Sequence, residues 1–381
     1  MSSNKTELFD YLLIGLKEYI DREKKYPYPD LLRHGMNALS LEIKKSISFP
    51  KTMNGFLRFV SEPVNDWCPK SFVPDKFDGD FGLIDETSLS EEANDYLSEL
   101  FESGKIPEYA SAKIKQLAID NAKFTRILDK LRDAYDEDNP QQAQQEYNIF
   151  RPFLIQNQYT TPRDIRKAFR RSKYISVEEV GELYEECQSN QTHWYCDFCG
   201  ILTEKYGRLK GLKPSLCKNH RPDKSYVHQV QWETGLLRIK EGIYQRVCFP
   251  GIPELNLHSA MEALQKENPD YLKEVRLYPG VDRYDLQLRF SDDTVWAIDY
   301  KDVRDPYRLA KTLKPLYSEG SLRYDESFYV ASDRCIKNHP DYTDIAREAA
   351  KALPYETYIV SDKTFRDRVE RKISELQKGE I

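Results

Sequence analysis

Two carboxylates and one amine lie near one another in two neighbouring strand-like segments. TVWAIDYK contains Asp299 and Lys301, two positions apart, and the preceding RYDLQL contains Asp285. Side chains alternate along a strand, so Asp299 and Lys301 are expected on the same face. If the two strands pair as a hairpin across FSDDT, Asp285 and Asp299 meet at one site. That combination suits phosphodiester hydrolysis, in which carboxylates hold Mg²⁺ or Mn²⁺ while a lysine orients water or stabilises developing charge.

The triplet D-x-K is weak evidence by itself, because charged residues make up 31% of this chain. The alternative is an exposed strand with a surface ion pair of little energetic value. The context favours the catalytic interpretation. An apolar run, 295–298, leads directly into Asp299, which indicates a buried strand whose charged end lies at the rim of a sheet.

A second group of residues has the spacing of a zinc site, C-x2-C-x17-C-x2-H. Two short pairs can converge on one tetrahedral Zn²⁺, and four protein ligands leave no open position, so a structural zinc is expected. The alternative is four unrelated residues in a reducing compartment. His193 and His228 lie nearby but lack the paired spacing. The predicted ligands are Cys196, Cys199, Cys217 and His220.

Basic residues recur at helical spacing in TTPRDIRKAFRRS, with Thr161 as the expected cap. Together with ISVEEVGELYEEC, capped by Ser176, this segment could form a helix-turn-helix-like unit that presents the basic stripe to DNA. A solvated face of a packing helix is the favoured alternative, because few small base-reading residues accompany the arginines. The stripe consists of Arg163, Arg166, Lys167, Arg170 and Arg171.

The elements around these sites divide the 381 residues into four regions. Helical spacing dominates residues 1–145, which end in a polar stretch expected to be a linker, and residues 146–190 form the small helical unit. Residues 191–250 carry the zinc ribbon. In 251–381 the pattern runs helix, three strands, helix, strand, helix, strand, helix, as in a mixed α/β layer arrangement. The predicted fold class is therefore α+β with several domains.

Composition narrows the function classes. The net charge is −6 and the pI about 5.7, so nucleic acid must be bound by local basic patches rather than by overall charge. No apolar stretch is long enough for a transmembrane helix and the N-terminus does not read as a signal peptide. Seven cysteines, three of them clustered with a histidine, favour metal binding in a reducing, cytoplasmic setting over a disulfide framework.

The order of elements, with D…(D/E)xK, resembles the PD-(D/E)xK restriction-endonuclease-like superfamily. PGIPELNLHSAMEAL, YPGVDRYDLQL and VWAIDYKD are similar to the nuclease associated with prokaryotic Piwi-type proteins and a helicase in three-gene defence islands. RPFLIQNQYTTPRDIRKAFRRS and the zinc ribbon resemble that nuclease's leader. The resemblance extends over roughly residues 146–340.

The resemblance implies a restriction-endonuclease-like domain with a central mixed sheet flanked by helices. It also implies metal-dependent DNA cleavage in anti-phage or anti-plasmid defence, with DNA, a Piwi-like protein and a helicase as partners and no membrane. Nucleases of this superfamily often act as dimers, so a homodimer is expected. The resemblance assigns the metal-binding acids to Asp285 and Asp299, the catalytic lysine to Lys301, and an acid on the first core helix to Glu254.

The acidic residues of the predicted metal site have alternatives in the sequence. Glu254 could instead favour a helix N-terminus through the dipole, with Glu262 in reserve. Tyr284, not proline, precedes Asp285. Asp282 is a substitute for Asp285, and Asp302 is a less favoured ligand because it faces away from Lys301.

Two other functions remain alternatives. One is a non-catalytic subunit that keeps the nuclease fold to bind DNA or a partner. The other is a zinc-dependent nuclease with its chemistry at Cys196 and His220, against which the closed ligand set argues.

Overall fold

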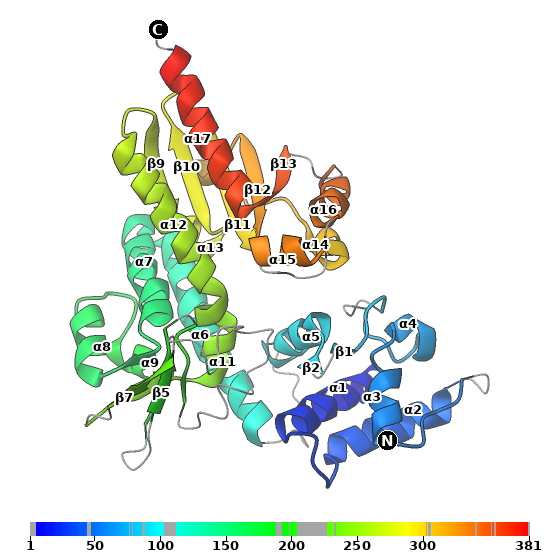
Figure 1. Cartoon of the computed structure of the whole chain (residues 1–381). Helices are drawn as coiled ribbons and strands as arrows, with labels where there is room; N and C mark the ends of the chain where they lie inside the picture. The colour runs from blue at the N-terminus through cyan, green and yellow to red at the C-terminus, as the bar shows by residue number, and fades with distance from the viewer. Residues whose placement is uncertain are drawn as a thin grey trace. The chain divides into compact units, whose positions relative to one another are not determined.

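The computed structural model describes residues 5–43, 47–75, 77, 79–85, 88–102, 112–187, 193–197, 199–203, 227–231, 234–301, 303, 306–339, 341–351, 353 and 356–379. The chain divides into two units, and the boundary lies between Ala122 and Lys123. Figure 1 shows the chain coloured by residue number from the N-terminus to the C-terminus. Within the described ranges, every helix is too short or too polar to cross a membrane.

The first unit is built from helices around its own apolar core. Helix α1 packs closely on α2: a Cβ placed on Gly15 would lie 2.1 Å from the backbone nitrogen of Leu32, so only glycine fits there. The elements are α1 (Lys5–Asp21), α2 (Asp30–Glu42), α3 (Met53–Phe59), α4 (Val64–Trp67), β1 (Ile84–Asp85), β2 (Ser88–Leu89) and α5 (Glu91–Glu102).

The second unit opens on two long helices, α6 (Ala112–Glu137, from Lys123 onward) and α7 (Pro140–Gln156). The polar segment that we expected to be a linker ending near Gln145 is instead mostly helix. Asn139 caps α7 by accepting a hydrogen bond from the Gln142 N–H at 3.0 Å, and Pro140 occupies the first turn, a position that suits proline. Ala143 and Tyr147 then bury one face of the helix.

A small helix-and-sheet module follows α7. Its elements are β3 (Tyr159–Thr160), α8 (Pro162–Phe169), α9 (Val177–Gly181), β4 (Tyr184–Glu186) and β8 (Leu237–Ile239). Strand β8 lies between β3 and β4 and is antiparallel to both. The helical unit placed at 146–190 is therefore completed by residues that follow the cysteine segment. Both predicted caps are present: Thr161 accepts from the Asp164 N–H, and Ser176 forms a capping box with Glu179.

The cysteine segment contributes a second small sheet, ordered β6-β5-β7. Its strands are β5 (His193–Cys196), β6 (Leu202–Thr203) and β7 (Val227–Val230), and β5 is antiparallel to both neighbours.

The C-terminal part contains the predicted mixed sheet, in the order β13-β12-β11-β10-β9. Strands β9, β10 and β11 are antiparallel, whereas β11, β12 and β13 are parallel. The five strands and four helices predicted after residue 251 are thus confirmed in their order, and two short helices that were not predicted, Pro279–Asp282 and Asp333–Asn338, lie between them. The elements are α11 (Glu241–Ile243), a π-helical turn (Tyr244–Cys248), α12 (Phe249–Glu267), β9 (Leu272–Leu277), α13 (Pro279–Asp282), β10 (Leu286–Phe290), β11 (Val295–Lys301), α14 (Pro306–Thr312), a 3₁₀ turn (Gly320–Leu322), β12 (Glu326–Ala331), α15 (Asp333–Asn338), α16 (Tyr342–Ala350), β13 (Thr357–Ser361) and α17 (Asp362–Gly379).

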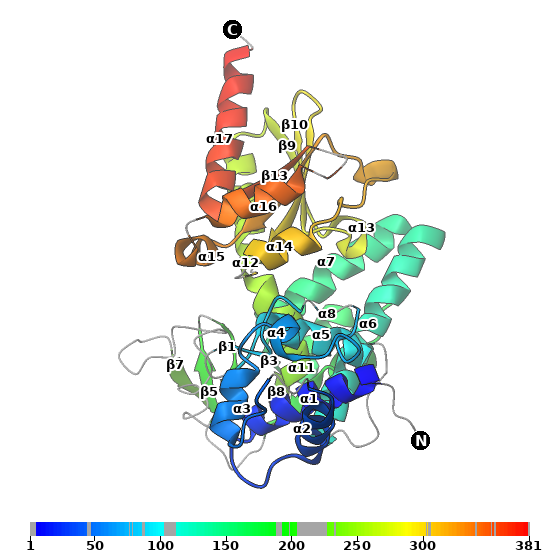
Figure 2. The same cartoon turned by 90° about the vertical axis from the view of Figure 1, so that its right-hand side faces the viewer.

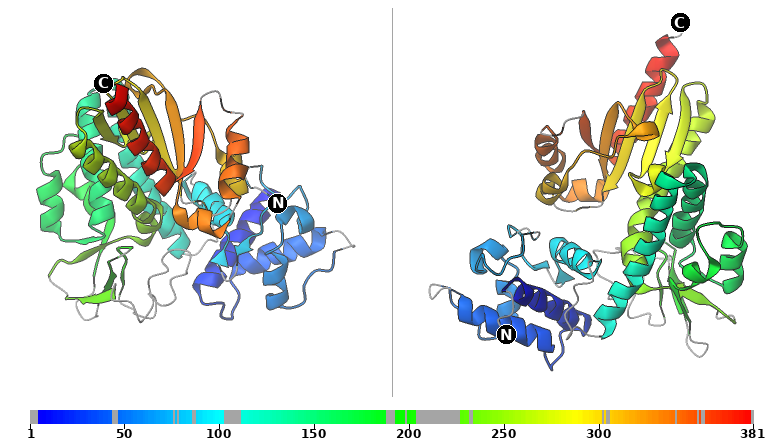
Figure 3. Two further views of the ribbon diagram at one scale, coloured as in Figure 1. Left: turned by 45° about the horizontal axis from the view of Figure 1, so that its top comes forward. Right: turned by 180° about the vertical axis from the view of Figure 1, so that it is seen from behind.

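Helices cover both faces of this sheet. Helices α12 and α17 pack on the face that carries Trp296 and Ile298, and α14 and α16 pack on the face that carries Ala297; Figures 1 and 3 show the two layers. Helices α14 and α16 also contact each other, as Figure 2 shows. Alternation along β11 therefore turns Tyr300 toward the first core and Asp299 and Lys301 toward the second face.

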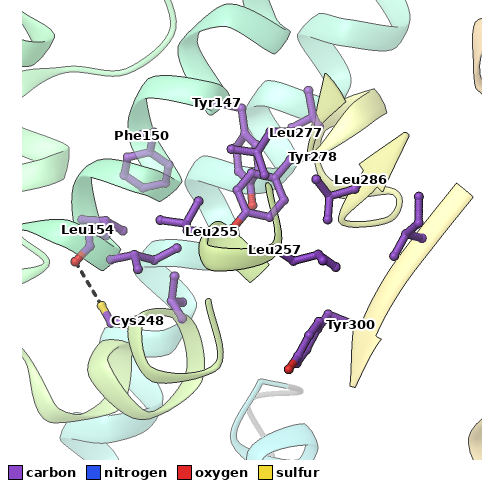
Figure 4. Close-up of a cluster of buried hydrophobic side chains, with 14 of the residues drawn as sticks. Tyr147, Phe150, Leu154, Cys248, Leu255, Leu257, Leu277, Tyr278, Leu286 and Tyr300 are labelled. Atoms are coloured by element: carbon purple, nitrogen blue, oxygen red, sulfur yellow. Dashed lines mark hydrogen bonds between the residues drawn. The ribbon is translucent and has the colours of Figure 1, made fainter. Parts of the chain in front are cut away.

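The first core continues from the sheet into α7. Figure 4 shows Tyr147, Phe150 and Leu154 of α7 gathered with side chains from α12 and from the β9–β10 connection. The Cys248 thiol donates to the Leu154 carbonyl at 3.3 Å within this cluster. Because these side chains share one core, α7 belongs to the same folded body as the five-stranded sheet.

Candidate active site

Asp299 and Lys301 lie together at the carboxyl end of β11. The Lys301 Nζ is 2.7 Å from Asp299 Oδ2, and the side chains are 35% and 17% exposed, for Lys301 and Asp299 respectively. Both follow Ala297 on one face of the strand, as alternation predicts. The pair is therefore partly open to solvent at the edge of the sheet.

Asp285 lies against the same end of β11. The regular β10–β11 ladder ends where Leu286 pairs with Ile298, and the Asp285 N–H then donates to the Ile298 carbonyl at 3.0 Å. The Asp285 carboxylate accepts from the Tyr300 N–H at 2.6 Å. This side chain is buried and forms no ion pair with any residue in the described ranges. Among those residues, it is a buried carboxylate without a cation in contact.

Burial and neighbouring carboxylates raise the pKa values of Asp285 and Glu254. Burial, followed by the charges of Glu254 and Asp299, raises the pKa of Asp285 well above its usual range. Burial raises the pKa of Glu254 to about 7 against the opposing effect of Arg151, with Asp282 and Asp299 adding to the rise. Asp285, Glu254 and Asp299 are thus close enough to repel one another, and a bound divalent cation would offset that repulsion.

Two acids of the site stabilise the charged form of Lys301. Burial lowers the pKa of its amine, but the charges of Asp299 and Asp285 outweigh burial, so the pKa rises above its usual value. The side chain therefore stays an ammonium group at neutral pH, able to donate hydrogen bonds and unable to accept a proton.

Arg151 of α7 links the acids around this site. Its Nη2 donates to both Glu254 oxygens, at 3.0 and 2.8 Å, and its Nη1 pairs with Asp282. The Tyr278 hydroxyl donates to Glu254 at 2.8 Å, and the Tyr147 hydroxyl donates to Asp282 at 2.8 Å. The guanidinium also lies 4.3 Å from the centre of the Tyr278 ring. Glu254 and Asp282 are therefore already engaged by one buried cation.

The position of Glu254 excludes the helix-dipole alternative. Helix α12 follows α11 and the π-helical turn without a break, so the helical segment begins at Glu241. Glu254 is more than three turns into that segment, whereas a dipole effect falls off within the first turn. Its side chain instead points to Arg151.

The loop between β9 and β10 has an unusual backbone and precedes Asp285. Left-handed φ values occur at Tyr278 (49°), Gly280 (66°), Val281 (55°) and Asp282 (68°), and such values are unfavourable for residues other than glycine.

Helices α6 and α7 hold this loop in place. Gln144 donates to the Tyr278 carbonyl at 2.9 Å and accepts from the Val281 N–H at 3.1 Å. Arg132 donates to the carbonyls of Val281 and Asp282. The backbone conformation of the loop that precedes Asp285 is therefore stabilised by side chains that lie more than 100 positions earlier in the chain.

The sequence-predicted residues thus separate into two groups. Asp285, Asp299 and Lys301 meet at the end of β11, whereas Glu254 is within electrostatic reach but bound to Arg151. The reserve residue Glu262 is 3.8 Å from His258 on α12, and Asp302 lies outside the described residues. In the described part of the chain, no three His, Cys, Asp or Glu side chains form a ligand set. Any metal here would therefore rely on two carboxylates and water, as Mg²⁺ often does.

Half of the predicted zinc site falls within the described residues. Cys196 and Cys199 are buried at a turn in which the Gly200 N–H donates to the Cys196 carbonyl at 2.7 Å and Gly200 has φ 74°. This turn places both cysteines at one end of the β5–β6 hairpin. Cys217 and His220 lie outside the described residues. Of the two reserve histidines, His193 is buried and His228 is 3.3 Å from Asp197.

Sequence reasoning missed Arg151 and the tyrosines around it. A signal was present in YNIFRPFLI, where Arg151 follows Tyr147 by one helical turn and interrupts a buried apolar stripe. A cation on such a stripe requires a buried acid as partner. The sequence does not say which acid, because Glu254 and Asp282 are more than 100 positions away.

Comparison with known proteins supports the nuclease interpretation of the last third of the chain. Residues 251–377 match the family described as "REase associating with pPIWI_RE". No match was found among curated proteins or among solved structures. The match begins at 251, so it does not reach 146–250, the region that resembles the leader of that nuclease. The resemblance to the nuclease associated with Piwi-type proteins, predicted from the sequence, is therefore confirmed for residues 251–377.

Proposed function

We propose that this protein is a metal-dependent endonuclease that hydrolyses phosphodiester bonds of DNA. The observation that carries the proposal is Asp285, a buried carboxylate that no cation of the described chain contacts, next to the Asp299–Lys301 pair. A bound divalent cation would supply the missing charge, neutralise the phosphate and activate water.

Each residue of the site has a distinct role in this proposal. Asp285 and Asp299 hold Mg²⁺ or Mn²⁺. Lys301, kept as an ammonium group by the two acids, donates to the scissile phosphate or to the attacking water and stabilises developing negative charge. Glu254 adds negative potential and, through Arg151, fixes the loop before Asp285 rather than contacting the metal.

Plasmid cleavage with Mg²⁺ or Mn²⁺ tests the proposal. Loss of one electrostatic group from such a site typically lowers the rate about 10²–10³-fold, and we expect Lys301→Ala and Asp299→Ala to fall by that much. Lys273→Ala, an exposed lysine on β9, is the control and should cut like the wild type. If Lys301→Ala and Asp299→Ala also cut like the wild type, the site assignment is wrong.

The alternative of a non-catalytic nuclease-fold subunit is favoured by one observation, the neutralisation of Glu254 by Arg151. Under that alternative the wild type binds DNA or a partner but does not cleave DNA with any divalent cation. The same plasmid assay therefore separates the two functions.

We further propose a structural Zn²⁺ held by Cys196, Cys199, Cys217 and His220. The hairpin turn at Cys196 and Cys199 supports half of this ligand set. Metal analysis of the purified chain should find one zinc per molecule, and Cys199→Ser should lose it. A zinc-free wild type would contradict the proposal.

The family description names an association with pPIWI_RE, and we propose a Piwi-like protein as a partner of this chain as well. A helicase of the same defence system, a homodimer and a cytoplasmic location complete the proposal. Co-purification of this chain with the Piwi-like protein tests that partnership, and the mass of the purified protein in solution tests the homodimer.

A further inference from the structure

Helix α8 is amphipathic, with one face fixed in the core. Ile165 and Phe169 are buried, and the Phe169 ring lies 6.2 Å from Phe150 and 5.2 Å from Phe153, centre to centre. Figure 1 shows α8 beside α7, on the side away from the five-stranded sheet. Because its apolar face is held on α7, the orientation of the opposite face is fixed.

The opposite face of α8 is strongly basic. Three cations lie on α8 itself, at positions i, i+3 and i+4, and two more follow at its C-terminal cap and in the next residue; all five are exposed. None of them forms an ion pair with any residue that the structure describes. The nearby acid Asp164 is bonded to the Thr161 hydroxyl at 2.7 Å. This basic face consists of Arg163, Arg166, Lys167, Arg170 and Arg171.

Helix α9, the next helix along, has the opposite charge. It and the residue after it carry Glu178, Glu179 and Glu182 and no cation. Glu179 pairs with Lys130 of α6 at 2.6 Å, and Glu182 pairs with Lys123 at 3.0 Å. In a helix-turn-helix unit the second helix normally enters the major groove of DNA. Here that helix is acidic and tied to α6, so it would repel phosphates.

We propose that the basic face of α8 is a docking surface for the phosphate backbone of double-stranded DNA. The occupant follows from charge complementarity, since five cations without counterions in the described chain match a closely spaced row of phosphates. Arginine and lysine contacts to phosphate carry no base information, so this docking is independent of sequence. The choice of DNA as the ligand rests on the proposed function. The contact between DNA and α8 lies outside the catalytic site.

DNA binding by the full chain in EDTA tests the docking surface apart from cleavage. Fluorescence anisotropy with a labelled duplex of about 30 base pairs would be measured over a series of salt concentrations, because counterion release sets the salt dependence. The test variant is Arg163→Gln/Arg166→Gln/Arg170→Gln. The control, Lys266→Gln/Lys273→Gln/Lys378→Gln, removes three exposed charges elsewhere in the same unit.

The test variant should bind at least about tenfold more weakly, and its slope of log K against log salt should fall by about 0.9 for each phosphate that the protein no longer neutralises. Two unrelated duplex sequences should be weakened by the same factor, and the control should bind like the wild type. The melting temperature should not change, because the three arginines are exposed.

Equal affinity and equal salt slope for the wild type and the test variant would overturn the inference. So would a wild type that does not bind DNA, in which case the surface suits an acidic protein instead. A wild type that binds through α8 but never cleaves would refute the proposed function and leave this inference standing. If the wild type cleaves DNA while the test variant binds DNA as tightly as the wild type, the docking surface is refuted and the proposed function stands.

Discussion

At the residue scale, the site combines one acid that contacts a cation with one that contacts none in the described chain. Asp299 has Lys301 at 2.7 Å, whereas the Asp285 carboxylate accepts from the Tyr300 N–H and contacts no cation of the described chain. A buried charge without a partner costs stability unless it is neutralised. The fold therefore holds an acid that destabilises the metal-free protein and that a cation would stabilise.

The first prediction is that Asp285→Asn stabilises the metal-free protein while abolishing cleavage. The amide keeps the hydrogen bond from Tyr300 but carries no charge, so in EDTA the unfolding free energy should increase by about 1–2 kcal/mol. The melting temperature should rise with it. Burial raises the pKa of Asp285, so the wild type loses stability as pH rises and the gain should be larger at pH 8 than at pH 5. A variant less stable than the wild type at pH 8 would contradict this account of Asp285.

The second prediction concerns the pH dependence of metal binding. The raised pKa values of Asp285 and Glu254, the latter about 7, mean that protons compete with the cation for this cluster below neutral pH. Affinity for Mn²⁺, measured by calorimetry without DNA, should strengthen as pH rises from 6 to 8, with proton release on binding. In Asp285→Asn the specific binding should disappear; affinity that is constant over this range would argue against an acid cluster as the site.

At the element scale, α7 contributes the cation that holds the acids together. The third prediction is that Arg151→Met lowers the unfolding free energy by about 3–5 kcal/mol, because it leaves Glu254 and Asp282 buried without a cation. Chemical denaturation of the second unit measures the loss. Adding Glu254→Gln should restore part of it, and Arg323→Met, an exposed position, should change little. A loss below about 1 kcal/mol would show that the network is not structurally important.

The fourth prediction is that residues 251–381 do not fold alone, although the family match falls within them. Without α7, the core side chains of α12 and of the β9–β10 loop lack Tyr147, Phe150 and Leu154, each contributing roughly 1.5–3 kcal/mol by burial. The fragment 123–381 should give dispersed amide spectra, and 251–381 should not. A well-folded 251–381 fragment would refute the structural role of α7.

The strands and longer helices after residue 251 could be predicted because each carries its own signal, whereas the short helices α13 and α15 were not predicted. The alternation in TVWAIDYK and the apolar run before Asp299 define β11, and the helices between the later strands have clear apolar faces. Helix α7 was partly missed because PQQAQQE is polar, and its buried face becomes apolar only from Ala143 onward. The Arg151 network was missed because its partners are distant in sequence, and pairing over such distances is fixed by tertiary packing alone.

At the scale of the whole molecule, the charge of the α8 face has the opposite sign to the net charge of the chain. The chain is acidic overall, with a net charge of −6, yet the exposed face of α8 is basic and the end of β11 holds an acid cluster. Diffuse negative charge weakens non-specific attraction to nucleic acid, so the proposed DNA contact is expected at the basic face of α8 and not over the whole surface. DNA binding should therefore weaken steeply with added salt.

The proposed catalytic centre requires Asp285 and Asp299 to hold one divalent cation between them. Anomalous diffraction from crystals of the full chain grown with Mn²⁺ tests this requirement. We expect one manganese peak between the two carboxylates, with oxygen ligands at about 2.0–2.3 Å and Glu254 still bonded to Arg151. A manganese ion bound elsewhere, or a site without manganese in which the two carboxylates point apart, would contradict it.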